Sequence, residues 1–245
     1  MDFLAKPFGV LMNFIYNYLA FDNYGLALIL FTFITKLLLF PLTYNQQKSM
    51  EKQQELAPKL EELKKSYPND PQKLQEEQQK LYSKYNVNPL SGCLPMLVQF
   101  PLIMALYRII RQPALYINSE SINMNFLGLF KLDVVPAWNP STIKGNLALY
   151  LPLVFIPIIT VVTTYLQQYL STKFAQSNRP KKDEAPNPMN GLLKIMPIMT
   201  FVFAFMVPSG LGLYWTMGNV FGIIQLILIK KVFVTKKKEG SVINV

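Results

Sequence analysis

The stretch FITKLLLFPL, residues 33–42, reads as the second half of a membrane-spanning helix, and it contains one charged residue. Lys36 stands among phenylalanine, isoleucine and leucine side chains. A lysine near the centre of a spanning helix costs roughly 2.5–3.5 kcal/mol on insertion scales. All 14 Asp and Glu residues of the chain fall in expected loops and tails, so the sequence offers Lys36 no acidic partner within the membrane.

Two interpretations of this charge stay open. In the first, the side chain snorkels to lipid phosphates, although Tyr44 at the expected helix end is about 12 Å away along the helical rise. In the second, Lys36 lines a water-filled cavity inside the bundle. In either case a charge without an internal partner needs water, a lipid phosphate or a visiting partner.

The composition is that of a membrane protein. The chain has 245 residues, of which 51% are hydrophobic and 16% charged, and its mean hydropathy is positive. These values are too apolar for an ordinary soluble domain of this length. One cysteine and no histidine exclude a disulfide framework, a multi-cysteine metal site and Ser-His triads. We therefore expect a protein that is not an enzyme and that binds no cofactor.

Apolar runs separated by polar segments predict an all-α polytopic membrane protein with five transmembrane helices. Two antiparallel helices with thin apolar stripes, joined by a proline turn, account for the longest polar segment. The expected organisation, in chain order, is an outer interfacial helix at 1–23, a span at 24–43, a cytoplasmic helical hairpin at 44–86, a span at 87–111, an extracellular loop with a short helix near Phe126 at 112–147, a span at 148–170, a cytoplasmic loop at 171–190, spans at 191–207 and 208–230, and a basic cytoplasmic tail at 231–245.

Lysine and arginine are distributed unevenly between the two sides of these spans. Eight fall in residues 44–86, five in 171–194 and five from Lys230 onward, whereas the loops of the opposite side carry five. Short cytoplasmic loops of membrane proteins are enriched in both residues. We therefore expect the N-terminus outside and the C-terminus in the cytoplasm.

Other polar side chains within the spans accompany Lys36. Each of them alone has an ordinary explanation, as an interhelical hydrogen bond or an interface aromatic. Together they predict a hydrophilic groove in the cytoplasmic half of the bundle, walled by apolar helices. The expected groove residues are Lys36, Thr32, Gln99, Gln168, Tyr214, Trp215 and Asn219.

This pattern of residues distinguishes three classes of function. A transporter should carry coupled acidic groups and repeat symmetry, and five spans without internal acids show neither. An intramembrane enzyme needs a nucleophile with a base, and neither Ser209 nor Cys93 has a histidine to serve it. A fixed cation without a proton-accepting partner favours a binding device that lets polar or acidic peptide segments enter the membrane partly hydrated.

Three motifs carry a resemblance to a known family. The run NVNPLSGCLP occupies residues 86–95, PSGLGLYW occupies 208–215, and FPLT occupies 40–43. They resemble the second, the last and the first conserved spans of the YidC/Oxa membrane-protein insertases. The resemblance covers nearly the whole chain, from about residue 8 to residue 231.

The resemblance implies a non-enzymatic insertase and chaperone of the bacterial plasma membrane, acting as a monomer on nascent membrane proteins, alone or with the Sec translocon. It implies five spans around a hydrophilic groove, in which a basic residue, usually arginine, attracts acidic or polar parts of the substrate. Lys36 occupies that position here. The chain is similar to short family members without a large periplasmic domain.

The basic tail from Lys230 to Lys238 has two interpretations. Its charges can anchor the chain end to anionic lipid headgroups. Alternatively, the tail and the cytoplasmic loops contact ribosomal RNA, since family members with basic tails can bind translating ribosomes. A rival function, a passive chaperone or assembly factor beside a larger translocon, also stays open.

Overall fold

A computed structural model describes residues 2–88, 94–119, 121–175 and 188–242 of the chain, and the described part is almost entirely helical. Two short strands and one 3-10 helix complete it. The elements are α1 (Asp2–Tyr18), α2 (Tyr24–Leu38), α3 (Phe40–Ser66), α4 (Pro71–Lys84), α5 (Leu94–Arg111), η2 (Pro113–Leu115), β1 (Asn125–Phe126), β2 (Phe130–Lys131), α6 (Pro140–Gly145), α7 (Leu147–Ala175), α8 (Pro188–Ala204) and α9 (Ser209–Val242).

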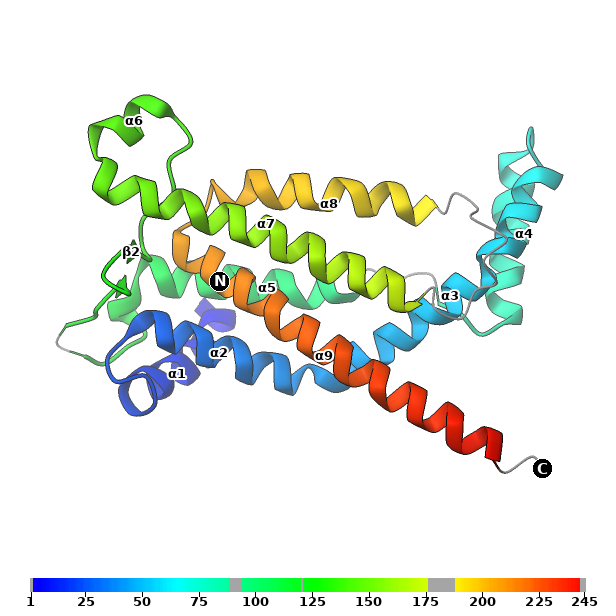
Figure 1. Ribbon diagram of the computed structural model, residues 1–245, viewed down its shortest axis with the longest axis horizontal. Helices are drawn as coiled ribbons and strands as arrows, with labels where there is room; N and C mark the ends of the chain where they lie inside the picture. The colour runs from blue at the N-terminus through cyan, green and yellow to red at the C-terminus, as the bar shows by residue number, and fades with distance from the viewer. Residues whose placement is uncertain (1, 89–93, 120, 176–187, 243–245) are drawn as a thin grey trace.

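The long helices lie side by side in an elongated bundle. α2, α5, α7, α8 and the first half of α9 run along the long axis, and α9 packs against both α2 and α7 (Figure 1). α1 crosses one end of the bundle, where it contacts α2 and α5. The strands and α6 lie at that same end, and α3 and α4 lie at the opposite one (Figure 1).

The first expected span is bent. α2 ends at Leu38 and α3 begins at Phe40, with 59° between their axes, so the break falls inside the segment expected to be one helix from 24 to 43. Pro41, in the first turn of α3, lacks an amide hydrogen, and in an unbroken helix its ring would clash with the carbonyl of Leu37. The first arm of the expected hairpin therefore begins at Phe40.

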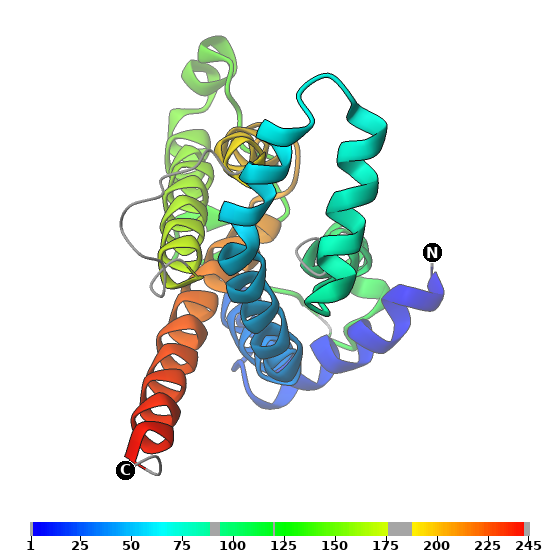
Figure 2. The ribbon, with the colours of Figure 1, turned by 90° about the vertical axis from the view of Figure 1, so that its right-hand side faces the viewer.

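α3 and α4 form a helical hairpin that projects from the end of the bundle (Figure 2). Its turn lies at the proline-rich break, because α3 ends at Ser66 and α4 begins at Pro71. The Asp70 side chain caps α4 by accepting a hydrogen bond of 2.9 Å from the amide of Lys73. Near the other end of α4, the Lys59 ammonium donates to the Tyr85 hydroxyl and lowers the pKa of that phenol.

Two described helices are long and apolar enough to cross a membrane, and a third candidate exists. They are α7 and residues Ser209–Lys231 of α9, and α2 together with α3 qualifies if the bent pair is one span. The other two expected spans correspond to α5 and α8, which directly follow residues 89–93 and 176–187, outside the described part. Five spans therefore stay a prediction.

The loop between α5 and α7 contains a β-hairpin where a short helix was expected near Phe126, and that expectation is wrong. β1 pairs antiparallel with β2, with Phe126 opposite Phe130. Three residues, 127–129, connect Phe126 to Phe130, and the Leu129 amide donates a hydrogen bond of 3.2 Å to the Phe126 carbonyl. The two central residues of this tight turn, Leu127 and Gly128, both have positive φ, 56° and 70°. The apolar run of this loop is short and contains Gly128, so the preference of these residues for a turn determines its structure.

The largest buried cluster lies at the end of the bundle that carries this hairpin. It joins three helices to the loop between α5 and α7 and to the start of α9, and Ile15, Phe31, Leu106 and Leu132 are fully buried in it. α1 is apolar on two sides: one side packs into the cluster, and Phe14 is exposed on the other. α1 thus belongs to the packed fold while keeping an exposed apolar face.

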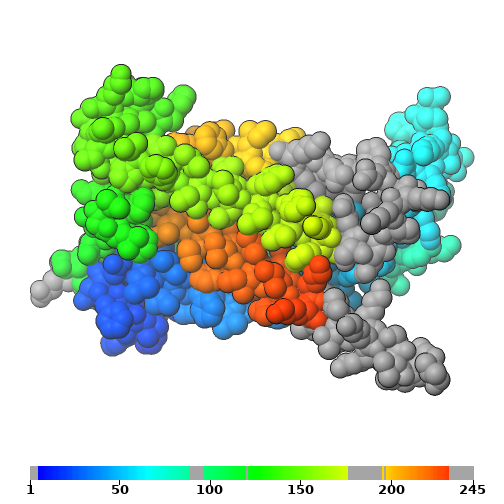
Figure 3. All heavy atoms as spheres, in the orientation of Figure 1, coloured from blue at the N-terminus to red at the C-terminus, as the bar shows by residue number. Residues whose placement is uncertain are grey.

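The α7–α9 contact depends on small residues. Figure 3 shows α7 lying along α9 over the middle of one face of the molecule. A Cβ atom at Gly212 would lie 2.5 Å from Ile156 Cγ2, closer than real Cβ contacts allow. Helices in membranes associate through such close approach, since lipid and apolar side chains are equally apolar.

Replacing Gly212 with alanine should therefore destabilise the protein by about 1–3 kcal/mol, the usual range for overpacking. SDS titration of the purified protein in mixed micelles measures this free energy of unfolding. Gly145→Ala is the matched control, because a Cβ at Gly145 meets nothing within 4 Å. Equal stability of the two variants would contradict the close contact.

Candidate functional site

Lys36 lies in the last turn of α2 with its side chain against α9. A Cβ atom at Gly218 of α9 would lie 3.5 Å from Lys36 Cε and 4.0 Å from Nζ. The backbone carbonyl of Lys36 accepts a hydrogen bond of 2.6 Å from Gln225 Nε2, also on α9. The backbone carbonyl and the end of the Lys36 side chain thus both lie against α9.

The direction of the Lys36 side chain bears on the two interpretations of its charge. Its backbone contacts Gln225, whereas its ammonium lies at Gly218, nearer the start of α9. Side chains on helices lean toward the helix N-terminus, and Lys36 follows this rule. The side chain therefore points away from α3 and α4 and into the bundle, which is opposite to a side chain snorkelling toward that end.

The charge of Lys36 has no acidic neighbour among the described residues. The ion pairs found there all lie on the α3–α4 hairpin and join Lys65 to Glu61, and Lys80 to Glu76 and Glu77. Lys36 thus makes no ion pair within the part of the chain that the structure describes.

Thr32 lies beside Lys36 and faces the same position of α9. A Cβ atom at Gly218 would lie 3.9 Å from Thr32 Cγ2. The Thr32 side chain is fully buried, and its hydroxyl donates a hydrogen bond of 2.6 Å to the Leu28 carbonyl of its own helix. Thr32 therefore presents a methyl group to α9, while its proton is already engaged.

Gln99, Tyr214 and Trp215 connect α9 to two further helices. Gln99 of α5 donates a hydrogen bond of 2.9 Å to the Tyr214 hydroxyl, and Tyr214 is buried. The Trp215 ring meets Phe203 of α8 edge to face, with centroids 5.8 Å apart. Tyr214 thus links α9 to α5, and Trp215 links α9 to α8.

Asn219 is held by a cluster of threonines on α7. Its amide nitrogen lies 2.8 Å from the Thr164 hydroxyl and 3.1 Å from that of Thr163. The Thr160 hydroxyl lies 2.8 Å from that of Thr216, one turn before Asn219 on α9. This polar cluster faces α7, whereas Lys36 meets α9 on the side that packs against α2.

The seven expected groove residues are therefore distributed over several helix contacts. Lys36 and Thr32 lie together against Gly218, and Gln99 lies with Tyr214. Trp215 contacts α8, and Asn219 contacts α7. Gln168 is on α7 and is half-buried. Sequence reasoning missed Gly218 and Gln225, although Gln225 is a polar residue inside an expected span and carried a detectable signal.

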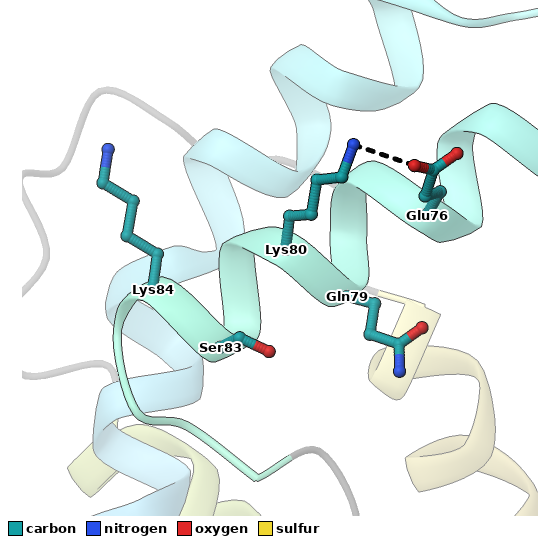
Figure 4. A pocket seen from close by; sticks show the side chains of 5 residues that line it. All are labelled: Glu76, Gln79, Lys80, Ser83 and Lys84. Atoms are coloured by element: carbon teal, nitrogen blue, oxygen red, sulfur yellow. Dashed lines mark ion pairs between the residues drawn. The ribbon is translucent and has the colours of Figure 1, made fainter.

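A hollow lies beside α4, on the helical hairpin and not at Lys36. Its volume is about 550 Å³, and it is lined by Glu76, Gln79, Lys80, Ser83 and Lys84 (Figure 4). The ion pair with Lys80 lowers the pKa of the Glu76 carboxyl. All lining residues come from one exposed helix, so the hollow is an open surface feature and encloses no site.

The Asn219 cluster predicts a measurable coupling between α7 and α9. Asn219→Leu and Thr164→Val should each destabilise the protein, and the double variant should lose less than their sum. Hydrogen bonds between membrane helices contribute about 0.6 kcal/mol on average and up to about 1.7 kcal/mol. SDS unfolding of the four proteins gives the coupling energy, and strict additivity would exclude the hydrogen bond at 2.8 Å.

Comparison with known proteins places this arrangement in a family. The family described as 60Kd inner membrane protein matches residues 14–238. A protein of Oceanobacillus iheyensis named membrane protein insertase YidC is 40% identical over 223 residues, covering 88% of this chain and 78% of the relative. Membrane protein insertase YidC 2 of Bacillus anthracis is 34% identical, covering 98% of this chain and 84% of the relative.

Other relatives are considerably longer. The membrane protein insertase YidC of Aquifex aeolicus is 36% identical over 242 residues, which cover 98% of this chain and 41% of that protein. Against this and similar relatives, the chain spans about two fifths of the relative's length. The match nevertheless extends over nearly all of the present sequence, so the chain belongs to the 60Kd inner membrane protein family, together with the proteins named membrane protein insertase YidC.

Proposed function

We propose that this protein is a membrane-protein insertase that captures short hydrophilic segments of nascent membrane proteins and helps them cross into the bilayer. The observation that carries the proposal is the placement of Lys36, whose charge points into the bundle with no acidic neighbour among the described residues. The names of its relatives agree with this function.

The proposed arrangement has five spans around a hydrophilic groove, with the N-terminus outside and the C-terminus in the cytoplasm. α2, α5, α7, α8 and α9 would be these spans. The arrangement is supported by the separation of the ends of the bundle, because the lysine-rich segment 44–86 lies opposite the loop 112–146 (Figure 1). The positive-inside rule then assigns the α3–α4 end to the cytoplasm.

The physical role of the groove is to lower a desolvation barrier. A hydrophilic segment that enters hydrocarbon loses several kcal/mol for each polar group left unsatisfied. A substrate carboxylate would recover part of this loss by pairing with Lys36, since the attraction between charges grows as the surrounding dielectric constant falls. The apolar segment of the substrate then moves into lipid beside the bundle and draws the short polar tail across.

This mechanism needs no covalent chemistry, and we propose that the protein acts as a monomer without a cofactor in the bacterial plasma membrane. Nascent membrane proteins are its partners, and it works alone or with the Sec translocon. The rival class is a passive chaperone beside a larger translocon. Liposomes that contain only the purified protein separate the two, because an insertase inserts a small substrate unaided.

Substitutions of Lys36 test the charge. In liposomes, Lys36→Arg should keep insertion of a substrate with an acidic outer tail, Lys36→Ala should slow it roughly tenfold, and Lys36→Glu should block it, because a like charge repels the tail. Protease protection of the translocated tail measures the rate.

A matched substrate provides the control for this series. Changing the tail's Asp and Glu to Asn and Gln removes the charge while keeping similar shape and polarity, so insertion should then depend little on residue 36. Normal insertion of the acidic substrate by Lys36→Ala would show that charge capture does not occur.

The basic tail is proposed to contact either anionic lipid or the ribosome. Deleting residues 232–245 should leave liposome insertion of a released substrate unchanged. If the tail binds ribosomal RNA, the deletion should also weaken co-sedimentation with translating ribosomes, and wild-type binding should fall steeply with salt. Equal ribosome binding by both proteins assigns the tail to lipid.

A further inference from the structure

Two contacts tie Lys36 to α9, and they act on different parts of the residue. Gln225 holds the backbone: its amide donates 2.6 Å to the Lys36 carbonyl, in the last turn of α2 where carbonyls lack partners from their own helix. Gly218 faces the side chain, close to Cε and Nζ. Gln225 is 8% exposed, so its contact lies inside the bundle.

Gly218 and Gln225 lie on the same side of α9. They are seven residues apart, which is two helical turns or about 10 Å along the axis. The extended Lys36 side chain covers part of this distance, running from its backbone near Gln225 toward Gly218. α9 thus provides both a fixed point for the backbone and a surface along which the side chain lies.

The surface at Gly218 is a notch with room for one methyl group. A Cβ there would make ordinary contacts of 3.5 Å with Lys36 Cε and 3.9 Å with Thr32 Cγ2. Further heavy atoms on that Cβ would approach the Lys36 side chain or Thr32, the two side chains nearest to it. Because Thr32 is fully buried and bonded to its own helix, the lysine is the side chain that must move.

We infer that α9 positions the charge of the proposed substrate site, with Gln225 fixing the end of α2 and Gly218 keeping open the notch for the Lys36 side chain. Gly218 and Gln225 are then positioning residues that determine selectivity for acidic segments. This inference rests on the proposed function, in which Lys36 receives those acids. Without the notch, the ammonium turns away from α9 and loses its fixed place.

A series of substitutions at residue 218 tests the inference. Gly218→Ala is the control, because its single methyl group fits the notch. Gly218→Val adds two methyl groups beyond the Cβ and should displace the lysine. Gly218→Asp adds a carboxylate from a Cβ position 4.0 Å from Nζ, so an internal ion pair should replace the substrate's acid. Gln225→Leu removes the donor to the Lys36 carbonyl.

The first measurement is independent of insertion. Acylation of Lys36 by a membrane-permeant amine reagent, followed by mass spectrometry of the peptide that contains it, reports the accessibility of the amine. Labelling should be slow in the wild type and in Gly218→Ala, and at least several-fold faster in Gly218→Val and Gln225→Leu. Equal labelling in all four proteins would overturn the inference, whatever the protein does with substrates.

The second measurement is the ratio of insertion rates for an acidic-tailed substrate and its amide-tailed counterpart. Gly218→Ala should keep the wild-type ratio, whereas Gly218→Asp should lower it roughly tenfold, to the value of Lys36→Ala. The double variant Lys36→Ala/Gly218→Asp should lose still more and resemble Lys36→Glu, because its carboxylate has no lysine to pair with and repels the acidic tail. A wild-type ratio near one would instead contradict the proposed function and leave the labelling result to decide the position of Lys36.

Discussion

Close approach to α9 is the constraint on which the rest of the bundle depends. In lipid, apolar side chains gain little by meeting each other, so helices associate where backbones can come near and where polar groups pair. α9 meets Ile156 of α7 at Gly212, the Gln167 amide at Gly222, and Lys36 of α2 at Gly218. A side chain at Gly212 would press on the branched Ile156 and push α7 away, whereas at Gly222 the flexible end of Gln167 can move aside.

The polar side chains of the bundle mostly serve this packing. The hydroxyls of Thr32, Thr35 and Thr160 donate to carbonyls of their own helices, which removes the cost of burying them. Asn219 uses its amide to hold α7. Counting polar residues therefore overestimates how many side chains of a span can bind a substrate. Lys36 differs from these residues, because no internal hydrogen bond or acid engages its ammonium among the described residues.

The sequence predicted the helical class and the helical hairpin with its turn after Ser66, because apolar periodicity and proline act locally. It did not predict the bend at Leu39 or the β-hairpin around Gly128, where one proline or one turn outweighs the apolar pattern. Contacts such as Gln225 with Lys36 join residues 189 positions apart, and only the packing of α2 on α9 determines them.

At the end of α2, the terminal carbonyl and the ammonium of Lys36 have different partners. A cation there can interact with the terminal carbonyls and the negative end of the helix dipole. Here the neutral amide of Gln225 bonds the Lys36 carbonyl, and the ammonium extends in the opposite direction, to Gly218. Because the Gln225 amide bonds the Lys36 carbonyl, the Lys36 ammonium is available to another partner. An ammonium also suits this place, since its three donors are not confined to a plane and can meet a carboxylate from several directions.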